Sequence, residues 1–334
     1  MFSKSFYSGP MDLQWKSLRL WLLLCASTLV LSVLACAAGP GPNAVSLDED
    51  EFDPSSADLS PFDRQNPPLI AEMNFASDGA AMNAILYEAQ GVGPHPTVVL
   101  LHGFPGNERN LDLAQAVRRA GWNVVFFHYR GAWGSGGQFS FLHVIEDVGA
   151  VVAAVRESEF AESHRIDEDR IALVGHSMGG FAALIAGAEL SAVDCVVSMS
   201  GANLGGTARI LENDPERAAG FAATIDGWSG PIRGPGGAEL IAEIIEHADR
   251  FDTRNHAASL AKKKLLLVAG GRDVVTPPEL HHGPLVETLR AVDASSLSTF
   301  VFDLADHAYS GQRMALARRV TSWLQSECTA NDSL

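Results

Sequence analysis

The chain has 334 residues, 47% of them hydrophobic, and a formal net charge of −16 at pH 7. This length allows one large core of roughly 250 residues with appendages. The acidic balance, without a basic block to neutralise phosphates, argues against nucleic acid as a partner. Four cysteines are too few for a disulfide framework in a chain this long. A bridge between Cys195 and Cys328 can be drawn, but no sequence pattern supports it.

A basic start followed by an apolar run predicts an export signal or anchor over residues 1–38. Three basic residues precede the uncharged run 20–38. The run ends Val33-Leu34-Ala35-Cys36, which resembles the bacterial lipoprotein signal and would make Cys36 the lipidated first residue. Two alternatives stay open: cleavage at Ala35-Cys36-Ala37 by ordinary signal peptidase, and an uncleaved anchor, because about 19 residues just suffice to span a bilayer. All three interpretations predict an exported protein of the cell envelope, with a candidate membrane tether at its N-terminus.

Residues 39–68 are predicted to form a disordered linker. They are rich in Pro, Asp, Ser and Gly, and they include an acidic run over 48–53. Such a composition buries too little apolar surface to fold by itself. The linker would connect the anchor to a folded domain over residues 69–328.

From residue 69 onward, expected strands alternate with expected helices. The strands are a first hairpin over 71–77 and 81–89, followed by 97–101, 122–129, 170–174, 193–200, 264–269 and 298–302; the helices are 111–120, 141–157, 181–188, 284–292 and 308–328. This alternation predicts an α/β fold with a mostly parallel central sheet and helices on both faces. Residues 201–262 interrupt the rhythm, with one helix expected over 238–248. They are predicted to form an inserted, partly helical cap, the alternative being a disordered surface loop.

The segment Val174-Gly175-His176-Ser177-Met178-Gly179-Gly180 lies at an expected strand-to-helix corner. An attacking serine there must stand on a sharp turn, where side chains two residues to either side would collide, so both of those positions are glycine. The following helix offers free N–H groups where negative charge would develop. Ser177 is therefore the candidate nucleophile. An ordinary Gly-rich turn has the same local pattern, so the assignment also depends on partners downstream.

Five segments together resemble the α/β-hydrolase superfamily. They are His102-Gly103-Phe104-Pro105-Gly106, residues 129–137, residues 175–180, Gly271-Arg272-Asp273 and Asp306-His307. The resemblance covers roughly residues 71–324 and is nearest to bacterial serine hydrolases close to the prolyl-oligopeptidase (S9-like) and dienelactone-hydrolase groups. It implies the α/β-hydrolase fold, with an inserted cap, and serine hydrolase activity. It implies neither a metal nor an organic cofactor.

By the same resemblance, Asp273 and His307 complete a catalytic triad with Ser177. A serine needs a base to take its proton, and histidine is the usual base because its pKa lies near neutral pH. An acid must orient the imidazole, and the order Ser…Asp…His is that of this fold. Asp306 is a weaker candidate for the acid because sequence neighbours rarely orient each other's rings. Asp252 is weaker still because it would have to reach across from upstream.

The remaining histidines of interest have structural interpretations. His176 is expected to pack beside the nucleophile, His102 to brace the oxyanion loop and His128 to lie in the core. The pair His281-His282 is expected to be solvated rather than to bind metal, because adjacent side chains diverge. Trp133, in the Gly-rich loop 131–137, is expected either to line the substrate pocket or to pack on the fold.

The oxyanion hole needs two donors. The backbone amides of Phe104 and Met178 are the candidates. Oligopeptidases place a tyrosine near this loop, and none closely follows His102-Gly103 here, which weakens a peptidase assignment. The sequence thus predicts hydrolysis of a small-molecule carboxylic ester through an acyl-enzyme. The alternatives are an S9-like aminopeptidase or oligopeptidase acting on short peptides, an acyltransferase, and a binding protein that keeps the fold without catalysis.

Overall fold

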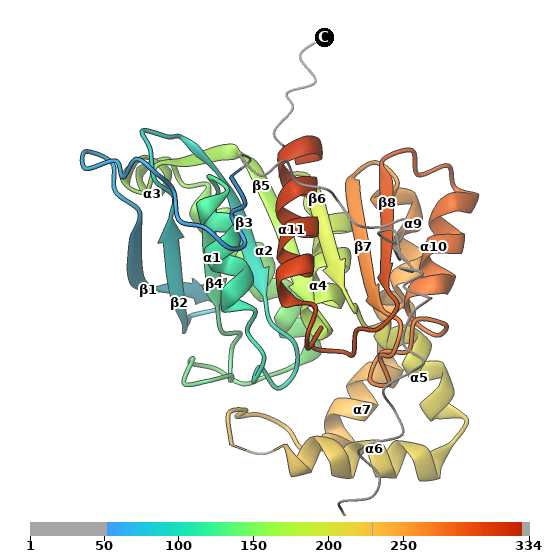
Figure 1. Cartoon of the computed structure of the whole chain (residues 1–334). Coiled ribbons are helices and arrows are strands. Elements are labelled where there is room, and N and C mark those ends of the chain that lie inside the picture. Colours follow the sequence, from blue (N-terminus) through green and yellow to red (C-terminus); the bar gives the residue numbers. More distant parts are fainter. Residues whose placement is uncertain (1–51, 229, 329–334) are drawn as a thin grey trace, which may run out of the picture. The chain divides into compact units, whose positions relative to one another are not determined.

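The computed structural model describes residues 52–228 and 230–328 (Figure 1). The predicted export segment 1–38, with the candidate lipidation site Cys36, lies outside the described residues, as do positions 39–51 of the predicted linker. Among the helices that the structure describes, none combines the length and the apolar character needed to cross a membrane.

Residues 52–68 differ from the predicted disordered linker, because they are hydrogen-bonded to the domain. The Asp53 carboxylate accepts a hydrogen bond from Arg318 Nε at 2.8 Å, on helix α11 (Arg313–Trp323). The Pro54 carbonyl accepts one from Arg119 Nε at 2.6 Å, on helix α1 (Leu111–Arg119). Two arginines of the folded domain therefore anchor a segment too polar to fold alone. The ordered part begins before residue 69, contrary to the prediction.

Within the described residues, eight strands form one sheet in the order β1-β2-β4-β3-β5-β6-β7-β8. Their bounds are β1 Leu69–Ser77, β2 Ala80–Glu88, β3 His95–Leu101, β4 Asn123–Phe127, β5 Ile166–His176, β6 Val193–Met199, β7 Lys264–Gly270 and β8 Leu297–Phe302. Strand β2 pairs antiparallel with β1 and β4, and all other pairs are parallel. This confirms the predicted α/β class and its mostly parallel sheet.

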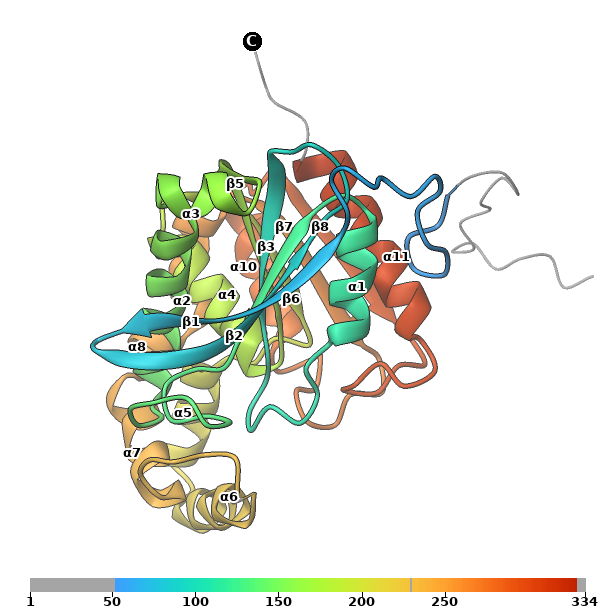
Figure 2. The ribbon, with the colours of Figure 1, turned by 90° about the vertical axis from the view of Figure 1, so that its left-hand side faces the viewer.

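Helices cover both faces of the sheet (Figure 2). One face carries α1 and α11, and the other carries α2 (Phe141–Val155), α3 (Ser158–Ser163), α4 (Met178–Glu189) and α10 (His282–Ala291). The side chains of β3 alternate between the two cores: Val99 and Leu101 pack with α2 and α4, and Val98 and Leu100 with α1. Because both faces are buried, the central strands are continuous apolar runs rather than alternating ones.

The insertion between β6 and β7 is helical and lies at the carboxyl ends of the parallel strands (Figure 1). It contains α5 (Leu204–Glu212), α6 (Pro215–Gly227), α7 (Gly237–Glu246), α8 (Ala248–Phe251), η1 (Thr253–His256) and α9 (Ala257–Leu260). We call α5–α7 and their connections the cap. The Glu243 carboxylate of α7 accepts hydrogen bonds from the Phe141 and Leu142 amides at 3.1 and 3.0 Å, which caps helix α2. This contact fastens the cap to the domain.

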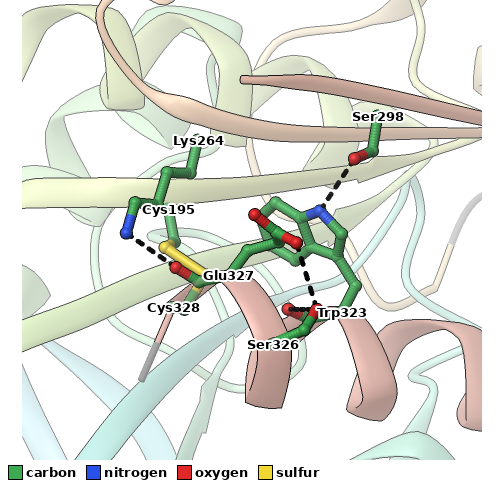
Figure 3. The surroundings of a disulfide bond; sticks show 7 residues. All are labelled: Cys195, Lys264, Ser298, Trp323, Ser326, Glu327 and Cys328. Carbon is green, nitrogen blue, oxygen red and sulfur yellow. Dashed lines mark hydrogen bonds between the residues drawn. A yellow bond between two sulfur atoms is a disulfide. The ribbon is translucent and has the colours of Figure 1, made fainter. Parts of the chain in front are cut away.

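A disulfide joins Cys195 of β6 to Cys328, at the end of η2 (Leu324–Cys328) (Figure 3). Beside it, Lys264 Nζ donates to the Glu327 carbonyl at 2.7 Å. The bridge depends on the last helical segment lying beside the middle of the sheet. That is a long-range feature, which explains why no sequence pattern supported the pairing.

Replacing both cysteines, as Cys195→Ala with Cys328→Ala, should lower the free energy of unfolding by about 2–5 kcal/mol. The bridge closes a loop with a sequence separation of 133 residues, so its removal restores much conformational freedom to the unfolded chain. Urea unfolding of the oxidised protein and the double variant measures the difference. The native sequence in excess reductant is the matched control, and its urea midpoint should equal that of the double variant. If the oxidised protein, the reduced protein and the variant all unfolded at the same urea concentration, the assigned bridge would be contradicted.

Candidate active site

Ser177 lies at the turn between β5 and α4 with φ 59° and ψ −119°. A non-glycine residue rarely adopts such a positive φ, and it persists only where the surroundings enforce it. A Cβ added to Gly175 would lie 2.0 Å from the Gly179 carbonyl oxygen, and one added to Gly179 would lie 2.1 Å from the Leu101 carbonyl oxygen. Both flanking glycines are therefore required by close backbone packing, and the turn places Ser177 on the wall of a cavity.

Asp273 and His307 meet at the carboxyl edge of the sheet, after β7 and β8 respectively. His307 Nδ1 lies 2.8 Å from Asp273 Oδ2. Asp273 Oδ1 accepts the backbone amides of Val275 and Thr276 at 2.8 and 2.9 Å. Burial opposes ionisation, but the hydrogen bonds from His307 and Thr276 outweigh it and hold the pKa of Asp273 well below its usual range. The carboxylate is thus ionised at neutral pH and can only accept a hydrogen bond, so the proton between the two groups is on His307 Nδ1. Nε2 is the ring nitrogen that the carboxylate does not engage.

His176 connects the serine turn to the loop that carries His307. Its Nε2 lies 2.7 Å from the His307 carbonyl oxygen, to which it can only donate, and the two rings are 4.7 Å apart between centroids. Burial lowers the pKa of His176 to about 4, so the ring is neutral. Ser177 and His307 both lie in the described part of the chain, and the Ser177 hydroxyl makes no hydrogen bond within 3.5 Å to the His307 imidazole. In free enzymes such catalytic contacts are often long and shorten when substrate binds.

The two rival acids are held elsewhere. Asp306 is exposed, and its Oδ1 accepts the Ser310 amide at 2.8 Å. Asp252 binds Arg254 through both carboxylate oxygens, and its Oδ1 also accepts from Asn203 Nδ2 at 2.9 Å. Of the three candidate acids, the structure therefore brings Asp273 to the imidazole of His307.

The two predicted oxyanion donors flank Ser177. Met178 is the first residue of α4, so its amide has no acceptor within the helix. A Cβ added to Gly103 would lie 3.0 Å from Ser177 Cβ, so the loop after β3 passes directly against the serine. Within the described part of the chain, neither the Met178 amide nor the Phe104 amide donates to a protein acceptor. Both N–H groups are thus available to a bound oxygen atom.

His102, His128 and Trp133 form a cluster of rings against the loop after β3. His102 Nδ1 lies 2.7 Å from the Gly103 carbonyl oxygen, and His102 Nε2 lies 3.2 Å from His128 Nδ1. Trp133 stacks on His128 and donates from Nε1 to the Pro105 carbonyl at 2.8 Å. Trp133 therefore packs against this loop instead of lining the cavity. The sequence indicated that His102 would brace the loop, but it carries no signal for the contact with His128, which depends on β3 lying beside β4.

The buried histidines should make the protein less stable in acid. Burial lowers the pKa of His102 to about 4 and that of His128 to about 3, as it does for His176, whereas an unfolded histidine titrates near 6.5. As the pH falls from about 6.5 to about 4, the unfolded chain takes up protons that the folded chain excludes, so the free energy of unfolding falls across that window.

Urea unfolding at pH 7.5, 5.5 and 4.5 measures this loss. A His128→Gln variant removes one of the titrating groups and should show a shallower pH dependence than the native sequence. A free energy of unfolding that stays constant from pH 7.5 to 4.5 in both proteins would contradict the assignment of neutral buried rings.

A cavity of about 860 Å³ opens beside the serine. Ser177, Phe104 and Met178 lie on one wall, and α5 and α6 of the cap form the other. His281 also lines it, and its Nδ1 accepts the Asn203 amide at 2.9 Å. Within residues 52–228 and 230–328, no group of three or more His, Cys, Asp or Glu side chains is placed to hold a metal ion.

The model of the alpha/beta hydrolase family matches residues 98–324, which run from β3 to α11 and include all three residues of the predicted triad. This chain belongs to the alpha/beta hydrolase family. The resemblance predicted from the sequence motifs is thereby confirmed.

Among curated proteins, this hydrolase-family chain is 32% identical over 135 residues to an uncharacterised 31.7 kDa protein of Escherichia coli, from the traX–finO intergenic region. The match covers 40% of the chain and 46% of that protein, so it spans about half the relative's length. Among solved structures, Est1E from Butyrivibrio proteoclasticus with bound ferulic acid superposes with a TM-score of 0.63 at 19% identity, over 77% of this chain and 100% of that one. An acylaminoacyl peptidase from Pyrococcus horikoshii superposes with a TM-score of 0.58 at 15% identity, over 80% of this chain and 43% of that one. At these identities the structures establish a shared fold.

Proposed function

We propose that this member of the alpha/beta hydrolase family is a serine hydrolase that cleaves carboxylic esters through an acyl-enzyme intermediate. The observation that carries the proposal is the 2.8 Å contact between His307 and Asp273 beside a serine held at φ 59°. An ionised carboxylate, an imidazole that it orients and a serine on a strained turn together form the arrangement needed to activate a hydroxyl group.

In the proposed reaction, Ser177 Oγ attacks the ester carbonyl carbon while His307 Nε2 takes the hydroxyl proton. Asp273 keeps the Nδ1 proton in place and stabilises the imidazolium that forms. The carbonyl oxygen becomes an oxyanion, which accepts hydrogen bonds from the Phe104 and Met178 amides. His307 then gives its proton to the leaving oxygen, and the acyl group stays on Ser177.

Water completes the cycle. His307 takes a proton from water as the water attacks the acyl-enzyme, and the acid leaves when the proton returns to Ser177. The same acyl-enzyme would serve an acyltransferase if an alcohol replaced water, or a peptidase if the leaving group were an amine. In this proposal two backbone amides hold the oxyanion, because the Tyr129 hydroxyl beside the loop after β3 already donates to the His102 carbonyl at 3.1 Å. This arrangement favours the esterase.

A panel of p-nitrophenyl esters and amino-acid p-nitroanilides, run on residues 52–334, tests the proposal. We expect turnover of esters that depends on Ser177 and little turnover of anilides. Anilide turnover at rates comparable to ester turnover would replace the esterase with the peptidase. An added alcohol that diverts most of the acyl group from water would favour the acyltransferase.

The proposal includes an exported protein, tethered to the membrane by the N-terminal segment 1–38 or by a lipid on Cys36. The disulfide between Cys195 and Cys328 supports this placement, because disulfides form and persist mainly in oxidising compartments outside the cytoplasm. The partner is a small ester substrate, and the cap, which lies within the predicted insertion 201–262, covers it.

A further inference from the structure

The cavity beside Ser177 is large and its walls are mostly apolar. Its volume of about 860 Å³ lies in the upper part of the range of roughly 300–1,000 Å³ that holds drug-sized ligands. The apolar lining includes Phe104, Phe141, Leu204, Ile210, Phe221 and Trp228. The rim is apolar as well, with Val274 86% exposed and Leu280 53% exposed. A two-carbon acetyl group would leave nearly all of this surface without contacts.

The charged side chains of the cavity are paired or lie at the rim. Arg254 binds Asp252 with Nε at 2.9 Å and Nη2 at 2.6 Å, so its charge is neutralised by an internal carboxylate. Arg217 Nε lies 3.6 Å from Asp214 Oδ2, and both side chains lie at the cap surface. Among the described lining residues, no cation is left free to bind a carboxylate on the substrate. The carboxylate of Glu279, which also lines the cavity, is exposed and lies at the rim. The inner part of the cavity therefore favours an uncharged occupant.

The position of His307 decides which half of the ester the cavity holds. His307 must protonate the leaving oxygen, so the alcohol half lies on the imidazole side of Ser177. The cavity walls include Ser177 and both oxyanion residues, but His307 is not among the described residues that line them. The half of the substrate that enters the cavity is the one that stays bonded to Ser177.

We propose that the cavity under the cap is an acyl-binding site, and that the substrates are uncharged esters of bulky apolar acids with about eight or more carbons. This inference rests on the proposed esterase function and adds the substrate class. It places chain-length selection in the cap, in particular on helix α6.

Helix α6 turns one face to the cavity. The residues of α6 and its C-cap that line it recur every three or four positions, as expected for one side of a helix: Arg217, Gly220, Phe221, Thr224, Ile225 and Trp228. A Cβ added to Gly220 would meet no atom within 4 Å. Gly220 lines the cavity and is also exposed, so a large side chain there has room to extend over the cavity mouth without displacing the backbone. Glycine is in addition an unfavourable residue inside a helix. Ala219 is exposed and lies on the opposite side of α6, which makes it a matched control.

The test compares kcat/KM for p-nitrophenyl acetate and octanoate, at octanoate concentrations below micelle formation. For the native sequence we expect octanoate to exceed acetate by about 100-fold or more, because each fully buried methylene is worth roughly fourfold and burial of about three to four of the six extra carbons gives this factor. Gly220→Phe should lower the octanoate value on the order of tenfold or more and change the acetate value much less, because it removes only the distal acyl space. The octanoate kcat/KM of Gly220→Ala should lie between those of the native sequence and Gly220→Phe. Ala219→Phe should give the native values for both esters.

Two failures are distinguishable. If no ester is turned over in a Ser177-dependent manner, the proposed function fails and the acyl site with it. If Ser177-dependent turnover is present but acetate matches or exceeds octanoate, the esterase stands and the acyl-site inference is overturned. Equal losses for acetate and octanoate in Gly220→Phe would also overturn it, because the side chain would then act on the fold or on the reacting groups.

Discussion

Ser177→Ala is expected to lower kcat for p-nitrophenyl esters by about 10³-fold or more. The variant removes the only atom proposed to bond to the acyl carbon, while the oxyanion amides and the acyl cavity remain. The residual rate should therefore come from binding and the oxyanion hole alone. The measurement is kcat and KM on the ester panel, with circular dichroism to show that the fold is retained.

The KM value separates this explanation from a general loss of structure. Alanine fits the positive φ at position 177 no better than serine does, so the turn should persist with similar strain. KM should stay within a few-fold of the native value, because the cavity walls are unchanged. A variant that keeps more than a tenth of the native kcat would mean that Ser177 is not the nucleophile.

Asp273→Asn is expected to lower kcat on the order of 10³–10⁴-fold. An amide cannot stabilise the imidazolium. Its NH₂ group would also compete for the place where the carboxylate accepts the His307 Nδ1 proton, which favours the wrong tautomer. The existing contacts from the Val275 and Thr276 amides to Oδ1 should hold the new side chain in the same rotamer. The loss would thus be in kcat and not in KM.

Asp306→Asn is the matched control for this change. It alters the carboxylate directly adjacent to His307 in sequence, but that group binds the Ser310 amide and is exposed. Its kcat should stay within about threefold of the native value. If the two variants exchanged their effects, the acid of the triad would be Asp306, and the structural assignment of Asp273 would be wrong.

Much of the fold was predictable because its signals are local. The apolar runs, the glycines around Ser177 and the alternation of strands with helices each lie within a few residues of one another. The chain order Ser…Asp…His then limited the choice of partners, and the structure brings Asp273 to His307 as that order predicts. Most strand boundaries follow the apolar segments for the same reason, but β5 begins at Ile166 and includes the charged residues 167–170, before the predicted start at residue 170.

What the sequence missed depends on contacts between distant segments. The ordered course of residues 52–68 depends on Arg119 and Arg318, which lie far along the chain. The bridge between Cys195 and Cys328 depends on the last helix lying beside β6. Composition describes only what a segment can bury by itself, so it cannot register partners supplied by the rest of the fold.

The cap was predictable as an interruption but not as a structure. No local pattern indicated that Glu243 would cap α2, or that α6 would turn one face toward Ser177. These arrangements decide the volume and polarity of the acyl cavity. The substrate class therefore depends on contacts that only the folded chain creates.

The central claim is that Ser177 is activated for covalent attack by His307 and Asp273. The most direct measurement is to treat the folded protein with a fluorophosphonate and map the modified peptide by mass spectrometry, on the native sequence and on Ser177→Ala and His307→Ala. We predict stoichiometric phosphonylation of Ser177 in the native protein, none in Ser177→Ala and a much slower reaction in His307→Ala. Folded native protein that remains unlabelled, or that carries the label on another residue, would contradict the account.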